Sequence, residues 1–148
     1  YRIVSGHGDG PAHGQGELRV SAGAEPAEMD LDAVRADLDD AVLDAEAIYA
    51  RFAAAGIDYG PAMRALVGLR TGRDRDGRPH ALAELAMPTC WQGEAAAQML
   101  HPCLLDAAFQ ATLGLMPAQV DAPPGGLALP FALDRLVVYG PLPSRLWA

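Results

Sequence analysis

The segment HPCLLDAAFQATLGL, residues 101–115, constrains the fold of this chain more than any other segment. Pro102 suits the first turn of a helix, where its missing N–H group would have no partner in any case. Eight apolar side chains then cover nearly the whole circumference of that helix: Leu104, Leu105, Ala107, Ala108, Phe109, Ala111, Leu113 and Leu115. A helix that is apolar on all sides is normally enclosed by other elements, often by a sheet. We therefore expect one buried helix at the centre of the fold.

Two polar residues interrupt this apolar surface. Asp106 and Gln110 are four residues apart, so they lie on the same face of the helix. A buried carboxylate without a partner costs several kcal/mol, and its presence therefore requires an explanation. The helix pattern alone leaves two interpretations open. Either Asp106 caps a neighbouring loop with Gln110 bonded beside it, or it is a functional carboxyl group.

A family resemblance favours the second interpretation. The ten residues HPCLLDAAFQ resemble the HPxxLDAxxQ segment of dehydratase domains in modular polyketide synthases, and they match it at every fixed position. In that family the aspartate is the catalytic acid, and the glutamine supports it. The resemblance thus implies a catalytic role for Asp106 and Gln110. It also makes His101 a structural residue at the start of the helix.

The loop GIDYGPAM, which precedes the central helix in the chain, resembles the GYxYGPxF motif of the same dehydratases. Its glycine and proline residues favour a rigid turn that holds a phenol in a defined place. Tyr59, Gly60 and Pro61 match the motif and are implied to contribute to substrate binding, with Tyr59 supplying the side chain. Ile57 and Met63 depart from the motif. Ile57 lacks the hydroxyl group of a tyrosine, whereas Met63 preserves apolar packing.

A third segment that resembles the family follows the central helix. Leu129, Pro130 and Phe131 form the triplet that, in the dehydratases, leads into a strand and lines the acyl tunnel. The resemblance therefore implies a substrate-binding role for all three. The apolar content of this region predicts a strand from Leu127 to Gly140.

The remaining chain shows alternating helix and strand patterns. The expected elements are a strand near residues 12–20, a surface helix at 30–38, a helix at 44–55, and the two strands of a hairpin at 62–70 and 80–87. A long helix with strands before and after it predicts an α+β architecture, in which a curved antiparallel sheet wraps the helix. The resemblance names this architecture a hotdog fold.

The resembled dehydratases are double hotdogs, and the matching motifs belong to the second hotdog. The resemblance therefore implies that residues 1–148 form the C-terminal hotdog subdomain, truncated at both ends. The catalytic histidine of the family lies in an HxxxGxxxxP motif of the first hotdog. None of the four histidines in this chain has a glycine four residues later. We therefore expect the N-terminal half to supply the base, and the isolated chain to be inactive.

Composition argues against several other classes of protein. The net charge of −8 disfavours a nucleic-acid surface, which requires a basic patch. No apolar run approaches the ~20 residues of a membrane span. The two cysteines, Cys90 and Cys103, form no CxxC motif, so neither a zinc site nor a disulfide framework is indicated. We expect a cytoplasmic protein that binds no metal and no cofactor of its own.

The reaction that the resemblance implies is removal of water from a β-hydroxyacyl chain. The chain would be carried as a thioester on the phosphopantetheine of an acyl carrier protein. A base must take the α proton, and an acid must protonate the leaving hydroxyl group. The expected partners are the acyl carrier protein, the N-terminal hotdog half, other domains of the synthase, and a second copy in a dimeric parent synthase.

Three other functions remain open at this point. A related double hotdog uses much the same pocket for double-bond isomerisation or cyclisation. A non-catalytic domain of this kind would instead hold the synthase together. A free-standing hotdog thioesterase would also use a helix carboxylate, but it would need neither the GIDYGPAM loop nor the HP segment.

Overall fold

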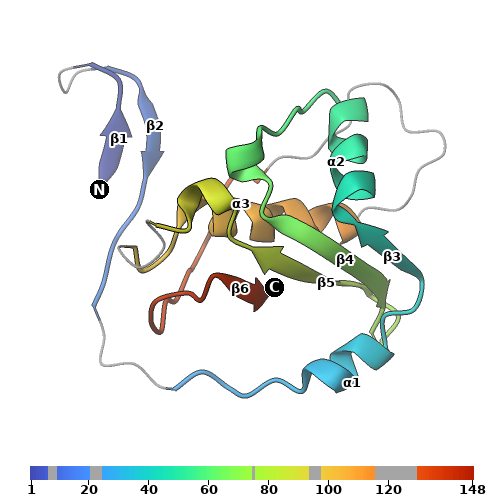
Figure 1. The fold of residues 1–148 in the computed structure, drawn as a ribbon. Helices are drawn as coiled ribbons and strands as arrows, with labels where there is room; N and C mark the ends of the chain where they lie inside the picture. The colour runs from blue at the N-terminus through green and yellow to red at the C-terminus, as the bar shows by residue number, and fades with distance from the viewer. Residues whose placement is uncertain (7–9, 21–24, 75, 94–97, 116–129) are drawn as a thin grey trace.

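The main sheet has four antiparallel strands. The computed structural model describes residues 1–6, 10–20, 25–74, 76–93, 98–115 and 130–148 (Figure 1). The strands are β3 (Ala41–Asp44), β4 (Leu66–Arg73), β5 (Pro79–Ala86) and β6 (Arg145–Trp147), in the order β3-β4-β5-β6. The hairpin of β4 and β5 forms the middle of the sheet, with partners from Leu66 and Leu85 at one end to Arg73 and Pro79 at the other.

The predicted hairpin is confirmed, with β4 beginning four residues later than expected. The residues before it instead form a 3-10 turn, η1 (Pro61–Met63), in which Pro61 occupies the first position. Proline cannot donate to a strand ladder, and its fixed φ angle suits the start of a helical turn. Strand β3 was not predicted, because four residues beside a helix cap give too short a pattern.

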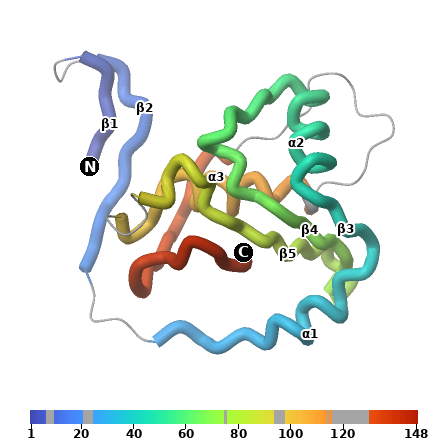
Figure 2. Tube along the Cα trace, in the orientation of Figure 1, coloured from blue at the N-terminus to red at the C-terminus, as the bar shows by residue number. Residues whose placement is uncertain are grey.

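The N-terminal residues form a second, two-stranded sheet, which Figures 1 and 2 show beside the main sheet. It consists of β1 (Arg2–Val4) and β2 (Ala12–Gln15). The strand predicted near residues 12–20 is thus confirmed only over its first part. Its partner β1 has three residues, so the ladder ends soon after the backbone N–H of Gly16 donates to the carbonyl oxygen of Tyr1 (3.0 Å).

Helix α2 (Ala45–Ala54) confirms the helix predicted at 44–55. The carboxylate of Asp44 accepts a hydrogen bond from the backbone N–H of Ala47 (2.9 Å), which satisfies a donor that the first helical turn leaves free. Gly56 follows the helix at a φ of +88°, a conformation that favours glycine and ends the helix. The surface helix is also confirmed, as α1 (Leu31–Ala36) with Asp30 as its cap.

Helix α3 (Pro102–Gln110) is the central helix, and it packs against β4 and β5 (Figure 1). The predicted buried helix is therefore confirmed, with Leu105 and Phe109 partly buried. From Ala111 to Leu115 the chain tightens into a 3-10 helix, η4. The hydroxyl group of Thr112 donates to the carbonyl oxygen of Phe109 (2.7 Å), an acceptor that a continuing α-helix would use for its own backbone.

The hydrophobic core joins α2, β4, β5 and α3. Its side chains belong to elements that are distant in sequence: Ile48, Phe52, Leu66, Leu69, Leu85, Met87, Leu104 and Ala107. These contacts hold α2 and α3 against the same sheet. Among the described residues, no helix is long and apolar enough to cross a bilayer.

The strand predicted from Leu127 to Gly140 is wrong over its described part. None of residues 130–140 belongs to a strand, and residues 127–129 lie outside the described residues. The physical reason is the lack of a partner for the backbone. Residues 130–140 pair with no strand of either sheet in the described chain, and an isolated strand cannot form its hydrogen bonds.

Candidate active site

Asp106 and Gln110 lie together on α3, as their spacing predicts. The side-chain amide nitrogen of Gln110 donates to Oδ2 of Asp106, at 2.8 Å. Asp106 is partly buried, whereas Gln110 is buried. The helix thus presents a carboxyl group whose orientation is controlled from the turn that follows it.

Gln110 also connects α3 to the loop that carries Tyr59. Its amide nitrogen donates a second hydrogen bond, to the carbonyl oxygen of Met63 at 3.2 Å. Met63 is the last residue of η1 and of the GIDYGPAM segment. The two motifs that resemble the dehydratases therefore meet in space through one glutamine side chain, although 47 residues separate Met63 from Gln110.

Tyr49 is the residue of this site that sequence reasoning missed. It lies on α2, is 7% exposed, and its hydroxyl group donates to the side-chain oxygen of Gln110 at 3.0 Å. The same hydroxyl oxygen accepts from the backbone N–H of Leu66, also at 3.0 Å. A signal was present: Tyr49 lies between Ile48 and Phe52 on the buried face of α2, and a buried tyrosine normally requires a polar partner.

Burial raises the pKa of the Tyr49 hydroxyl to about 12, although the hydrogen bond from Leu66 opposes this shift. The phenol therefore keeps its proton at neutral pH and remains a hydrogen-bond donor. The pKa of Tyr59 is also raised, first by burial and then by the negative charge of Asp106.

Tyr59 is held by aromatic packing. Its ring meets the ring of Phe52 edge-on, with centroids 5.0 Å apart, and the ring of Tyr49 in a similar way at 5.8 Å. The side chain of Arg64 donates to the carbonyl oxygen of Tyr59 (2.7 Å) and fixes the loop backbone. Ile57, which replaces the first aromatic residue of the motif, packs against the core.

The remaining expected residues shape the loop or lie apart from it. Gly60 and Pro61 are exposed, and they form the N-cap and first residue of η1. Pro130 and Phe131 are also exposed, Phe131 fully so at 101%, while Leu129 lies outside the described residues. Tunnel-lining roles for these three residues stay predictions.

His101 occupies a structural position. It is buried and is the N-cap of α3, where its Nδ1 atom accepts from the backbone N–H of Cys103 at 3.3 Å. Its ring lies 5.4 Å from the ring of Trp91. The imidazole is thus already engaged with the backbone, which agrees with the structural interpretation of the HP segment.

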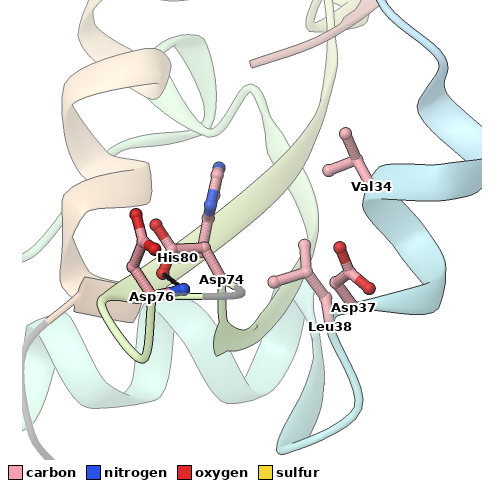
Figure 3. A pocket seen from close by; sticks show the side chains of 6 residues that line it. All are labelled: Val34, Asp37, Leu38, Asp74, Asp76 and His80. Atoms are coloured by element: carbon pink, nitrogen blue, oxygen red, sulfur yellow. Dashed lines mark hydrogen bonds between the residues drawn. The ribbon is translucent and has the colours of Figure 1, made fainter.

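A separate pocket of about 240 Å³ lies between the segment of α1 and the tip of the β4–β5 hairpin (Figure 3). Its lining residues are Val34, Asp37, Leu38, Asp74, Asp76 and His80. None of them belongs to the Asp106 site. Within the described ranges, no group of three His, Cys, Asp or Glu residues is arranged to hold a metal ion, either in this pocket or elsewhere.

A family model and a related protein both connect this chain with polyketide synthases. The model of the family described as "Polyketide synthase dehydratase N-terminal domain" matches residues 26–148. The polyketide synthase PksM of Bacillus subtilis (strain 168) is 30% identical over 138 residues, which cover 92% of this chain but 3% of that synthase. The chain therefore spans a very small part of this relative.

Solved dehydratase structures are also similar. The dehydratase domain from the CurF module of the curacin polyketide synthase is 28% identical, with a TM-score of 0.68; the match covers 83% of this chain and 41% of that one. An inactive aspartate-to-asparagine mutant of the CurK dehydratase is likewise 28% identical, with a TM-score of 0.68, and the match covers 84% and 42%. These similarities confirm the expected α+β hotdog fold.

Proposed function

This chain belongs to the polyketide synthase dehydratase family, and from that membership we propose that it is the acid-bearing, C-terminal half of a dehydratase. The observation that carries the proposal is the Asp106 carboxyl group on α3, bonded by Gln110 at 2.8 Å. The matched family is described as the N-terminal domain. Placement in the second half rests instead on the segments HPCLLDAAFQ and GIDYGPAM, which meet at Gln110.

The proposed reaction is elimination of water from a β-hydroxyacyl thioester. A base removes the α proton, the electron pair forms the new double bond, and the bond between the β carbon and its oxygen breaks. Asp106 gives its proton to the leaving oxygen, so that water departs and an enoyl thioester remains. We assign this transfer to Oδ1, because Gln110 engages Oδ2. General acid catalysis of this type contributes about 10²–10⁴ in rate.

The base is proposed to come from the rest of the dehydratase. His101, the histidine nearest to Asp106 in sequence, is buried and engaged with the backbone N–H of Cys103. The matched part of the CurF domain amounts to 41% of its length, which leaves ample chain for a second hotdog. The inactive CurK mutant, in which an aspartate is replaced, supports the choice of an aspartate as the acid.

The substrate is proposed to arrive on the phosphopantetheine arm of an acyl carrier protein. The relative PksM is a polyketide synthase of which this chain matches 3%, so other domains of such a synthase are proposed as further partners. Tyr59 would contact the substrate near Asp106, and Pro130, Phe131 and Leu129 would line the acyl chain. A dimeric parent synthase is part of the same proposal.

The direct test is an assay of the complete dehydratase domain that contains this chain. Conversion of a β-hydroxyacyl thioester to the enoyl product is followed by mass spectrometry. We expect Asp106→Asn to lower the rate about 100-fold or more. The control is Asp32→Asn on α1, whose side chain is 91% exposed and which should retain the wild-type rate. Full activity of the Asp106→Asn enzyme would refute the proposed function.

The proposal also requires that the 148-residue chain does not dehydrate the substrate by itself, because acid and base must act on one bound molecule. Addition of the proposed N-terminal half should restore turnover. Rapid turnover by the chain alone would mean that the base is among its own residues, and His101→Gln would be the first variant to examine. Isomerisation or cyclisation without loss of water would identify the related double-hotdog activities instead.

A further inference from the structure

Tyr49 lies outside both dehydratase-like segments, yet it is bonded to the residue that bonds Asp106. Its hydroxyl group reaches Gln110 from a different helix, across a separation of 61 residues in the chain. The contact is buried, with Tyr49 7% and Gln110 4% exposed. A hydrogen bond that links two packed helices at the candidate acid is a feature that could control the geometry of that acid.

The direction of each hydrogen bond in this network follows from its partners. The backbone N–H of Leu66 donates to the hydroxyl oxygen of Tyr49, so the phenolic proton is directed to the side-chain oxygen of Gln110. The amide nitrogen of Gln110 must then face the two remaining groups. These are the carbonyl oxygen of Met63 and Oδ2 of Asp106, both of which accept.

The opposite orientation of the Gln110 amide would fail at every partner. Its oxygen would face the carbonyl oxygen of Met63 and Oδ2 of Asp106. Neither atom has a proton to share, since the proposed acid carries its proton on Oδ1. Its nitrogen would face a tyrosine hydroxyl whose own proton would then have no acceptor. Tyr49 and Met63 therefore select the one orientation in which Gln110 donates to Asp106.

We propose that Tyr49 is a positioning residue for the Asp106 carboxyl group and acts on it through Gln110. This inference rests on the proposed function of Asp106 as the general acid. Tyr49 does not touch the reacting atoms in this account. Its role is to hold the Gln110 side chain in one conformation, so that Oδ2 stays bonded and Oδ1 is presented to the leaving oxygen.

The surroundings of Tyr49 suit a fixed support. Its ring packs against the rings of Tyr59 at 5.8 Å and Phe52 at 6.3 Å, and the guanidinium group of Arg64 lies over it at 5.1 Å. Burial keeps the hydroxyl protonated, with a pKa of about 12. The donor is thus present over the whole pH range in which an enzyme of this kind would be assayed.

The first experiment is Tyr49→Phe in the complete dehydratase domain, assayed with a β-hydroxyacyl thioester. This variant keeps the ring and removes only the hydroxyl group. We expect kcat to fall about 10-fold, because loss of the bond lets Gln110 and the acid move by a fraction of an ångström. KM should stay within about 2-fold of its wild-type value, because uniform binding of the substrate is not altered.

A double-mutant cycle with Gln110→Met tests whether Tyr49 acts through Gln110. If it does, Tyr49→Phe should lower kcat by less than about 2-fold once Gln110 is replaced, since neighbours in one network are not additive. Independent, multiplicative losses in the cycle would overturn the inference. The packing control is Ile48→Val, a fully buried neighbour on α2 that lacks polar atoms and should leave kcat unchanged.

A second variant keeps the test decisive if Tyr49→Phe does not fold. Replacement of Tyr49 with 3,5-difluorotyrosine retains the ring and the hydroxyl group but lowers the pKa of the phenol. The alkaline limb of the kcat profile should then move to lower pH, because the hydroxyl loses its proton sooner and ceases to donate to Gln110. An unchanged profile, with the enzyme folded, would refute a positioning role.

Asp106→Asn in the same enzyme separates this inference from the proposed function. If Asp106→Asn is inactive while Tyr49→Phe and the fluorinated enzyme behave as wild type, Asp106 is the acid and Tyr49 does not position it. If Asp106→Asn retains full activity, the proposed function itself fails. The Tyr49 variants therefore test the positioning role separately from the proposed role of Asp106 as the acid.

Discussion

Helix α3 and residues 130–140 are both rich in apolar side chains, but α3 buries many of them whereas residues 130–140 leave most of theirs exposed. In α3, Leu104 is 1% and Ala107 0% exposed, whereas Phe131 is 101% and Tyr139 59% exposed. The helix forms its backbone hydrogen bonds within itself and needs only an apolar surface to pack on. A strand needs a neighbouring strand as well. The difference teaches that an apolar pattern specifies a helix locally but a strand only together with its partner.

The largest contrast between the two regions should appear in stability. Leu104→Ala on α3 should lower the free energy of unfolding by about 2–5 kcal/mol, because it leaves a cavity in the core between α3 and the sheet. Urea denaturation of the purified chain measures this change. A cost below about 1 kcal/mol would show that α3 is not packed as the structure describes.

A smaller loss is expected at the network that joins α2 to α3. Tyr49→Phe should cost about 1–3 kcal/mol, because it leaves the buried N–H of Leu66 and the side-chain oxygen of Gln110 without their partner. The same urea titration measures it. If Tyr49→Phe is as stable as the wild type, ordered water must replace the hydroxyl group, and the inter-helix bond is not a structural constraint.

The cap of α2 should contribute less again. Asp44→Ala removes the acceptor of the Ala47 N–H group and should cost about 1 kcal/mol. Thermal unfolding followed by circular dichroism measures this loss, with Asp39→Ala, at an exposed position just outside β3, as the matched control. Equal effects of the two substitutions would mean that α2 does not depend on its cap.

The smallest effect is expected in residues 130–140. Leu136→Ala should change the stability of the isolated chain by less than about 0.5 kcal/mol, because its side chain is already exposed. If the same substitution in the complete dehydratase costs more, this segment packs against the remainder of the domain. A large cost in the isolated chain would instead show that the segment is buried there.

The same contrast explains what the sequence could predict. The Asp106–Gln110 pair was predicted because two positions four residues apart on one helix are neighbours whatever the rest of the fold does. The cap at Asp44 and the stop at Gly56 are equally local. The hydrogen bond between Tyr49 and Gln110 was not predicted, because the packing of two helices on one sheet brings these residues together.

The sequence also predicted the loop that carries Tyr59, but it did not predict how this loop is bonded to α3. The resemblance of GIDYGPAM to the dehydratase motif singled out Tyr59, which the structure packs beside Tyr49 and Phe52. The loop is bonded to α3 through the backbone carbonyl group of Met63. The methionine side chain does not indicate that role. Every residue has a backbone carbonyl group, so the residue types in a motif cannot predict which carbonyl accepts this hydrogen bond.

The central claim is that Asp106 protonates the leaving group, and a change of leaving group tests it most directly. Fluoride departs with far less need of a proton than hydroxide. In the complete dehydratase, Asp106→Asn should slow elimination from a β-hydroxyacyl thioester about 100-fold or more. Elimination from the matching β-fluoroacyl thioester should slow by less than about 10-fold, because the departure of fluoride depends on only part of the rate that the general acid contributes. Equal slowing of both substrates would contradict the assignment of Asp106 as the acid.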